Sequence, residues 1–159
     1  MRLLGVDLGE RRTGLALADT RVGLVEPLRV IEVPGGGASG GGRSASGDRL
    51  VEALAEAVGE FGPDVVVFGL PVNMDGTEGA AARRVRGVAA RLADRMEAAV
   101  AFHDERLTSA QADWEMAGSG LTRGQKKKRR DALAAAVILR SFLEEGGASS
   151  PGGDDAAAG

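Results

Sequence analysis

GVDLGERRTGLALAD, residues 5–19, is the stretch that decides the fold of this chain. An apolar run that ends at Asp7 turns at Gly9 and continues as a second apolar run from Leu15, which predicts a β-hairpin with Asp7 on its first strand. A carboxylate within a strand is costly to bury without a cation beside it, so Asp7 is expected to hold a metal or to face an open site. The motif alone leaves a second interpretation open, in which Asp7 ends the strand and caps the turn.

The composition is that of a single globular domain. The chain has 159 residues, 43% of them hydrophobic and 27% charged, and no apolar run reaches the length of a membrane span. No secretory signal is recognised, so we expect a cytoplasmic protein. The chain has no Cys and one His, His103, which excludes thiolate sites and zinc sites built on several His ligands. Any metal must then be held by carboxylates, which indicates Mg²⁺ or Mn²⁺.

The charges are unevenly placed along the chain. The net charge is −3, so nucleic-acid binding would need a local basic patch. All three Lys residues fall in one run, Lys126-Lys127-Lys128-Arg129-Arg130. Five cations at the start of a helix oppose the helix dipole, and their placement therefore favours a polyanion lying across them. A solvated basic loop is the alternative interpretation.

Hydrophobic periodicity predicts alternating strands and helices after the hairpin. Strands are expected at 23–33, 65–70 and 98–103, and helices at about 48–61, about 80–96, around Trp114 and from Asp131 to about 145. These elements describe one α/β domain over 1–145, with a mixed β-sheet and helices on both faces. The Gly/Ser-rich segment 34–47 is expected to be a flexible loop, 118–125 a loop, and 146–159 a disordered tail.

Three acidic residues fall at the ends of the expected core elements: Asp7, Glu105 and Asp131. Sites in open α/β sheets form outside the carboxyl ends of the strands, where Glu105 is expected. Asp131 shares a helix face with small residues that allow close approach to the sheet, which would bring the three carboxylates together. Crowded carboxylates raise one another's pKa unless a divalent cation screens them, so the cluster implies a metal. Taken singly, each acid is typical of a helix cap or a solvated strand end.

Two other residues have a chemical and a structural interpretation. His103 could act on a water or a leaving group, but packing at the strand end is the preferred interpretation. Trp114 could stack on a base, but core filling on its helix is preferred.

The motifs resemble the YqgF/RuvX family of pre-16S rRNA nucleases, which is also described as Holliday-junction-resolvase-like. The similar stretches are GVDLGERRTGLALAD (5–19), FGLPVNMDGTEG (68–79), HDERLTSAQA (103–112) and RRDALAAAVILRSFLE (129–144), which together cover 1–145. The resemblance implies a ribonuclease-H-like fold and metal-dependent phosphodiester cleavage, with Asp7, Glu105 and Asp131 as the catalytic and metal-binding positions.

We therefore expect a Mg²⁺- or Mn²⁺-dependent endonuclease acting on structured nucleic acid, which processes the 5′ end of pre-16S ribosomal RNA. Flanking phosphates would be bound by Arg106, Lys126, Lys127, Lys128, Arg129 and Arg130. Expected partners are the ribosomal RNA precursor, branched DNA or a ribosomal subunit, and the chain would act as a monomer or a homodimer.

Three alternatives stay open from the sequence. The first is a Holliday junction resolvase. The second is a phosphotransferase, because DLGxxxTG from Asp7 to Gly14 also resembles the phosphate loop of sugar kinases and other actin-like ATPases. The third is a non-catalytic RNA-binding module in which the acidic residues have no catalytic role.

Overall fold

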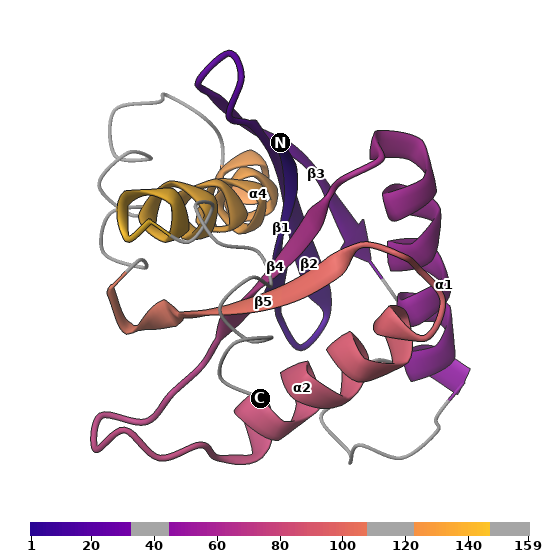
Figure 1. Cartoon of the computed structure of the whole chain (residues 1–159). Helices are drawn as coiled ribbons and strands as arrows, with labels where there is room; N and C mark the ends of the chain where they lie inside the picture. Colours follow the sequence, from indigo (N-terminus) through magenta and orange to yellow (C-terminus); the bar gives the residue numbers. More distant parts are fainter. Residues whose placement is uncertain (33–44, 108–122, 147–159) are drawn as a thin grey trace, which may run out of the picture.

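A computed structural model describes residues 1–32, 45–107 and 123–146 of the chain. They form one five-stranded sheet in the order β3-β2-β1-β4-β5, with helices on both faces (Figure 1), which confirms the expected mixed α/β architecture. The elements are β1 (Arg2–Leu8), β2 (Arg12–Asp19), β3 (Leu24–Glu32), α1 (Ala45–Phe61), β4 (Val65–Leu70), α2 (Ala80–Ala93), β5 (Ala99–Asp104), the 3-10 helix η1 (Glu105–Leu107) and α4 (Arg123–Glu144). No helix within the described ranges is long and apolar enough to cross a membrane.

Two helix boundaries differ from the sequence predictions. α1 begins at Ala45, inside the segment expected to be a loop, and α4 begins at Arg123, inside the loop expected at 118–125. The basic run Lys126–Arg130 therefore lies within α4 rather than before it. Gln, Lys and Arg are good helix formers, and this propensity outweighs their unfavourable position near the helix N-terminus. The rest of the expected loop 34–47, the expected helix around Trp114 and residues 147–159 lie outside the described residues.

β1 is the central strand of the sheet. It pairs antiparallel with β2, which places Asp7 opposite Gly14, and parallel with β4, which places Val6 opposite Phe68. β4 in turn pairs parallel with β5. The carboxyl ends of β1, β4 and β5 therefore share one edge of the sheet, where ligand and active sites of α/β sheets form.

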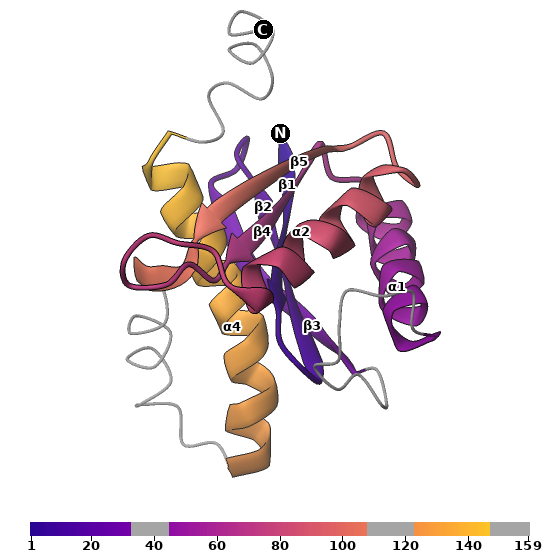
Figure 2. The ribbon, with the colours of Figure 1, turned by 90° about the horizontal axis from the view of Figure 1, so that it is seen from below.

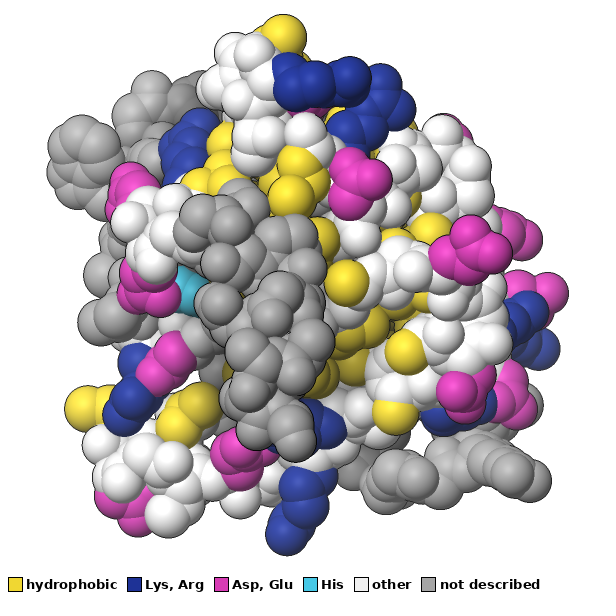
Figure 3. All heavy atoms as spheres, viewed as in Figure 1, with side chains coloured by type: hydrophobic (Ala, Val, Ile, Leu, Met, Phe, Trp, Pro, Cys, Tyr) yellow, Lys and Arg dark blue, Asp and Glu magenta, His cyan; other side chains and the backbone are white. Residues whose placement is uncertain are grey.

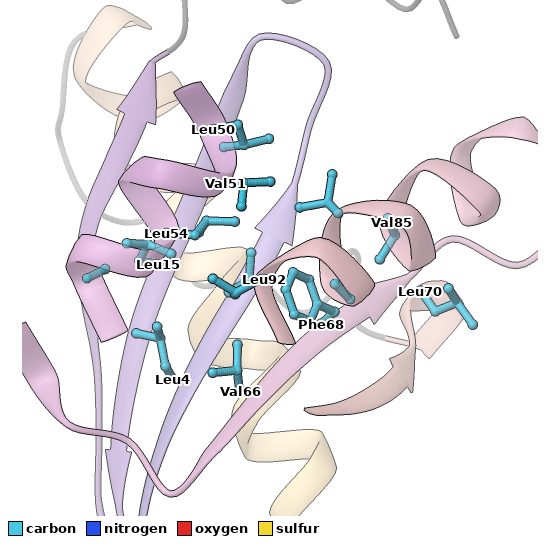
Figure 4. Packing of buried hydrophobic residues seen from close by; sticks show 14 of the residues in the cluster. Leu4, Leu15, Leu50, Val51, Leu54, Val66, Phe68, Leu70, Val85 and Leu92 are labelled. Carbon is cyan, nitrogen blue, oxygen red and sulfur yellow. The ribbon is translucent and has the colours of Figure 1, made fainter. Parts of the chain in front are cut away.

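The pleat of the central strands sends alternate side chains into two cores. Leu4, Val6 and Phe68 pack with α1 and α2 on one face (Figure 4). Leu3 and Val67 pack with α4 on the other face, and Figure 2 shows the sheet lying between α4 and the α1–α2 layer. Because side chains alternate along a strand, Asp7 lies on the face that α4 covers.

α4 crosses the sheet at glycines of β1 and β2. A Cβ on Gly5 would lie 2.6 Å from Cγ of Leu139 and 2.8 Å from the carbonyl oxygen of Ala135. A Cβ on Gly14 would overlap the carbonyl oxygen of Asp131. The backbone of α4 therefore rests directly on the hairpin, and Asp131 is fixed against the residue that pairs with Asp7.

Gly14→Ala is expected to push α4 away from the hairpin, because the added methyl group has no room beside Asp131. We expect the free energy of unfolding, measured by urea denaturation, to fall by about 2–3 kcal/mol. Gly87→Ala on α2 is the matched control, since nothing lies within 4 Å of a Cβ at that position. This control should stabilise the protein by up to about 1 kcal/mol, and equal effects of the two substitutions would contradict the packing described above.

Candidate active site

Glu105 reaches from the end of β5 across β4 toward Asp7. It is the first residue of η1, directly after β5. Its side chain lies over Gly69 of β4, where an added Cβ would lie 2.7 Å from Glu105 Oε1. In the parallel register, Gly69 follows Phe68 as Asp7 follows Val6, so Gly69 is the neighbour of Asp7 on β4. The missing side chain at Gly69 leaves the room in which Glu105 hydrogen-bonds to Asp7.

Asp7 and Glu105 are both half-buried. Burial, followed by the hydrogen bond and the negative charge of Glu105, raises the pKa of Asp7 to about 8. At neutral pH the pair is therefore more stable with a shared proton than with two negative charges. A divalent cation in place of that proton would offset both the desolvation and the repulsion.

Asp131 approaches this pair through its backbone. It is half-buried on α4, and its carbonyl oxygen lies against Gly14, beside Asp7 in the sheet. No three acidic or His side chains in the described part of the chain lie close enough together to hold one metal ion. The structure thus brings together the side chains of Asp7 and Glu105 and places the backbone of Asp131 beside them. A metal site shared by the three carboxylates stays a prediction.

The position of Glu105 is fixed by the residues on either side of it. The guanidinium of Arg106 donates to both carboxylate oxygens of Asp104: Nη2 lies 2.6 Å and Nε 2.8 Å from Oδ2, and Nε lies 3.1 Å from Oδ1. This pairing holds the pKa of Asp104 below its usual value. Nη1 of Arg106 also donates to the carbonyl oxygen of Asn73 at 3.4 Å. Arg106, predicted to bind phosphate, thus holds η1 in place and ties it to the segment after β4.

His103 is a packing residue, in agreement with the preferred interpretation of the sequence. Its side chain is buried between β5 and α4, with Nε2 2.8 Å from the hydroxyl of Ser141. Its ring meets the ring of Phe142 edge-on.

The basic run enters the structure as part of α4. Arg130 lies within α4 directly before Asp131, and its side chain is exposed. For Lys126, Lys127, Lys128 and Arg129 the structure describes the helical backbone, and the predicted phosphate contacts of their side chains stay a prediction.

Two further arginines at the site were not singled out from the sequence. Arg84 of α2 donates from Nη1 to the carbonyl oxygen of Gly9 at 2.8 Å, which holds the turn that follows β1. Arg12 pairs with Glu32 on the face that α4 covers, and its buried Nη1 has no hydrogen-bond partner among the described residues. The position of Arg12 inside the hairpin motif could have marked it as a site residue from the sequence. Nothing in the sequence marks Arg84, because its contact with Gly9 depends on how α2 packs.

The architecture is that of a known class of fold. The structure resembles Thermus thermophilus RuvC, solved in complex with a Holliday junction substrate, with a TM-score of 0.57 and 16% identity over 92% of this chain and 96% of that chain. A second Thermus thermophilus RuvC structure gives a TM-score of 0.54 at 17% identity. The fold is therefore ribonuclease-H-like, as the sequence predicts.

The sequence comparison identifies the family within this class. The family profile described as "RuvX: Holliday junction resolvase" matches residues 1–145, and the chain belongs to this family. A "Putative pre-16S rRNA nuclease" of Lactococcus lactis subsp. cremoris (strain MG1363) is 34% identical over 126 residues, 79% of this chain and 82% of that protein. One of the same name from Anaeromyxobacter sp. (strain K) is 38% identical over 127 residues, 80% and 85% of the two chains. Family and fold together define the chain as a phosphodiester-cleaving hydrolase.

The raised pKa of Asp7 predicts how stability changes with pH. The folded chain binds this proton more tightly than the unfolded chain, so the contribution of Asp7 to the free energy of unfolding falls as the pH rises from 3.8 to about 8. In metal-free buffer at pH 8, we expect Asp7→Asn to be about 1–3 kcal/mol more stable than the wild type, and at pH 4 the difference should vanish.

Urea denaturation in EDTA at a series of pH values measures this difference. Glu56→Gln, at an exposed position of α1, is the control and should follow the wild type throughout. A constant difference between Asp7→Asn and the wild type across the whole pH range would contradict the shared-proton description of the pair.

Proposed function

We propose that the chain is a divalent-metal-dependent endonuclease that processes the 5′ end of pre-16S ribosomal RNA. The observation that carries the proposal is the Asp7–Glu105 pair, two acidic groups held together at the carboxyl edge of the sheet at the expense of a raised pKa. Buried carboxyl pairs are unfavourable in a purely structural role, since burial and repulsion both oppose their charges. The names of the curated relatives supply the substrate class.

The donor chemistry of the site fits Mg²⁺ or Mn²⁺. Asp7, Glu105 and Asp131 are the residues proposed to hold the metal, because hard divalent cations prefer carboxylate oxygens and a cation would replace the proton that the pair now shares. The bound metal would supply an activated water and would stabilise the charge that develops on the cleaved phosphate. Asp131 belongs to the set because its backbone is already fixed beside Asp7 by the contact with Gly14.

The protein's own cations are proposed to orient the substrate. Arg12 lies on the same face as Asp7, and its buried Nη1 is a donor suited to a phosphate oxygen. The run Lys126–Arg130 ends directly before Asp131 and would bind the neighbouring phosphates along α4. Arg106 is proposed to contribute to this binding from the edge of η1, while its pairing with Asp104 keeps Glu105 in position. We place this activity in the cytoplasm, on the free RNA precursor or on a ribosomal subunit.

Cleavage of Holliday junctions is the second candidate, favoured by the description of the family that matches residues 1–145. A symmetric junction would require two copies of the active site, and therefore a homodimer. Pre-16S RNA cleavage requires one copy and is compatible with a monomer. The phosphotransferase and the non-catalytic RNA-binding alternatives are less favoured, because the chain belongs to a family of nucleases.

A competition between substrates tests the proposed function. The purified protein, with Mg²⁺ or Mn²⁺, is offered a 5′-extended pre-16S RNA and a four-way DNA junction, and we expect cleavage of the RNA. Asp7→Asn, Glu105→Gln and Asp131→Asn should each lower the cleavage rate by about 100-fold or more, because each removes a proposed metal ligand. Glu56→Gln should cut as fast as the wild type.

Other outcomes of the same experiment contradict the proposal. Full activity of Asp7→Asn would exclude the proposed site. Cleavage of the junction alone would favour the second candidate, and salt-sensitive RNA binding without metal-dependent cleavage would favour a binding module.

A further inference from the structure

The segment between β4 and α2, residues 71–79, is a rigid turn that we call the β4–α2 hairpin. The backbone N–H of Asn73 donates to the carbonyl oxygen of Thr77 at 2.8 Å, and their side chains are hydrogen-bonded at 3.1 Å. The carboxylate of Asp75 accepts from the backbone N–H of Thr77 at 3.0 Å and from its hydroxyl at 2.6 Å. These bonds fix the conformation of the hairpin before any ligand binds.

Contacts at its base hold the hairpin against the active site. Glu78 forms a bidentate ion pair with Arg86 of α2, with distances of 2.5 and 2.9 Å. Arg106, the residue after Glu105, donates to the carbonyl oxygen of Asn73 at 3.4 Å. This hydrogen bond links the hairpin to η1. Its tip is connected to Glu105 through one side chain and one hydrogen bond.

Met74 stands at the tip of this hairpin and is 92% exposed. Figure 3 shows hydrophobic atoms at the outer edge of the molecule over this segment. The other large exposed hydrophobics of the described residues, Val22 and Leu24, belong to the β2–β3 turn and the start of β3, at the opposite end of β1. Among the residues that the structure describes, Met74 is thus the large exposed apolar side chain at the active-site edge. One side chain is too small an area to hold a protein partner.

The charge beside Met74 indicates which part of a nucleic acid it can contact. The hydrogen bonds from Thr77 hold the pKa of Asp75 below its usual value, so Asp75 is negative. The nearby cations Arg86 and Arg106 are paired with acids. A negative tip repels the phosphate backbone, whereas the uncharged faces of bases suit a flexible thioether.

On the basis of the proposed nuclease function, we propose that Met74 inserts against the bases of the substrate at an opened base step next to the cleaved phosphate. Apolar side chains such as Met occupy partly unstacked base steps in this way, and a rigid support avoids the entropy cost of ordering the wedge. The substrate class is then a nucleic acid that opens readily beside the cut, at a bulge, a branch or a boundary between single strand and duplex. Continuous duplex is the disfavoured substrate.

Cleavage rates on two matched substrates test this inference. The substrates differ only in the base step beside the cut, which is paired in one and mismatched in the other. Met74→Ala should slow cleavage of the paired substrate by about ten-fold and that of the mismatched substrate by less than about two-fold, because the mismatch removes the unstacking cost. Met74→Leu and the remote control Val22→Ala should behave as the wild type. Equal losses on both substrates, or no loss on either, would overturn the inference.

A binding measurement separates this inference from the proposed function. The Asp7→Asn variant is mixed with the same substrate carrying 2-aminopurine at the step, so that fluorescence reports unstacking without cleavage. The fluorescence should rise, and Asp7→Asn/Met74→Ala should abolish the rise. If it rises but the wild type with Mn²⁺ cuts nothing, the nuclease proposal fails and the Met74 inference holds. Cleavage without a Met74-dependent rise overturns the Met74 inference alone.

Discussion

The contact of α4 with the β1–β2 hairpin is the constraint on which the rest of the structure depends. Glycines at 5 and 14 allow the helix backbone to lie on the strands, and an alanine at either position would collide with it. A helix separated from the sheet by ordinary side chains would hold the backbone of Asp131 further from β1 and Asp7. The small residues of the hairpin motif are therefore as necessary to the proposed three-carboxylate site as its acidic residue.

The same packing creates the electrostatic cost of the site. α4 and η1 enclose Asp7, and burial together with Glu105 raises its pKa to about 8. Glu105 stays beside Asp7 despite this repulsion because Gly69 leaves room for its side chain. The contacts of Arg106 with Asp104 and Asn73 also hold η1 in position. An arrangement that is unfavourable without a cation and favourable with one is suited to a metal-dependent enzyme.

Much of this architecture could be predicted from the sequence, and its limits have physical causes. Strands and helices followed from hydrophobic periodicity, and the pairing of Asp7 with Glu105 followed from where strands end. The predicted start of the last helix, Asp131, was wrong: α4 begins at Arg123, because the helix propensity of Lys and Arg outweighs their unfavourable interaction with the helix dipole. The sequence could not predict that Arg106 pairs with Asp104. A guanidinium binds phosphates and carboxylates alike, and the fold decides which carboxylate lies near it. The sequence predicts the approach of Asp131 to the hairpin from the small residues on its helix face, and the contact of its backbone with Gly14 agrees with this.

The most direct test of this account is anomalous diffraction from crystals of the wild type grown with Mn²⁺. The central claim is that the packing of α4 on Gly14 lets Asp7, Glu105 and Asp131 act as one metal site. The account predicts a strong Mn²⁺ peak coordinated by carboxylate oxygens of all three residues. Mn²⁺ bound only elsewhere, or a peak between Asp7 and Glu105 with the Asp131 carboxylate turned away from it, would contradict it.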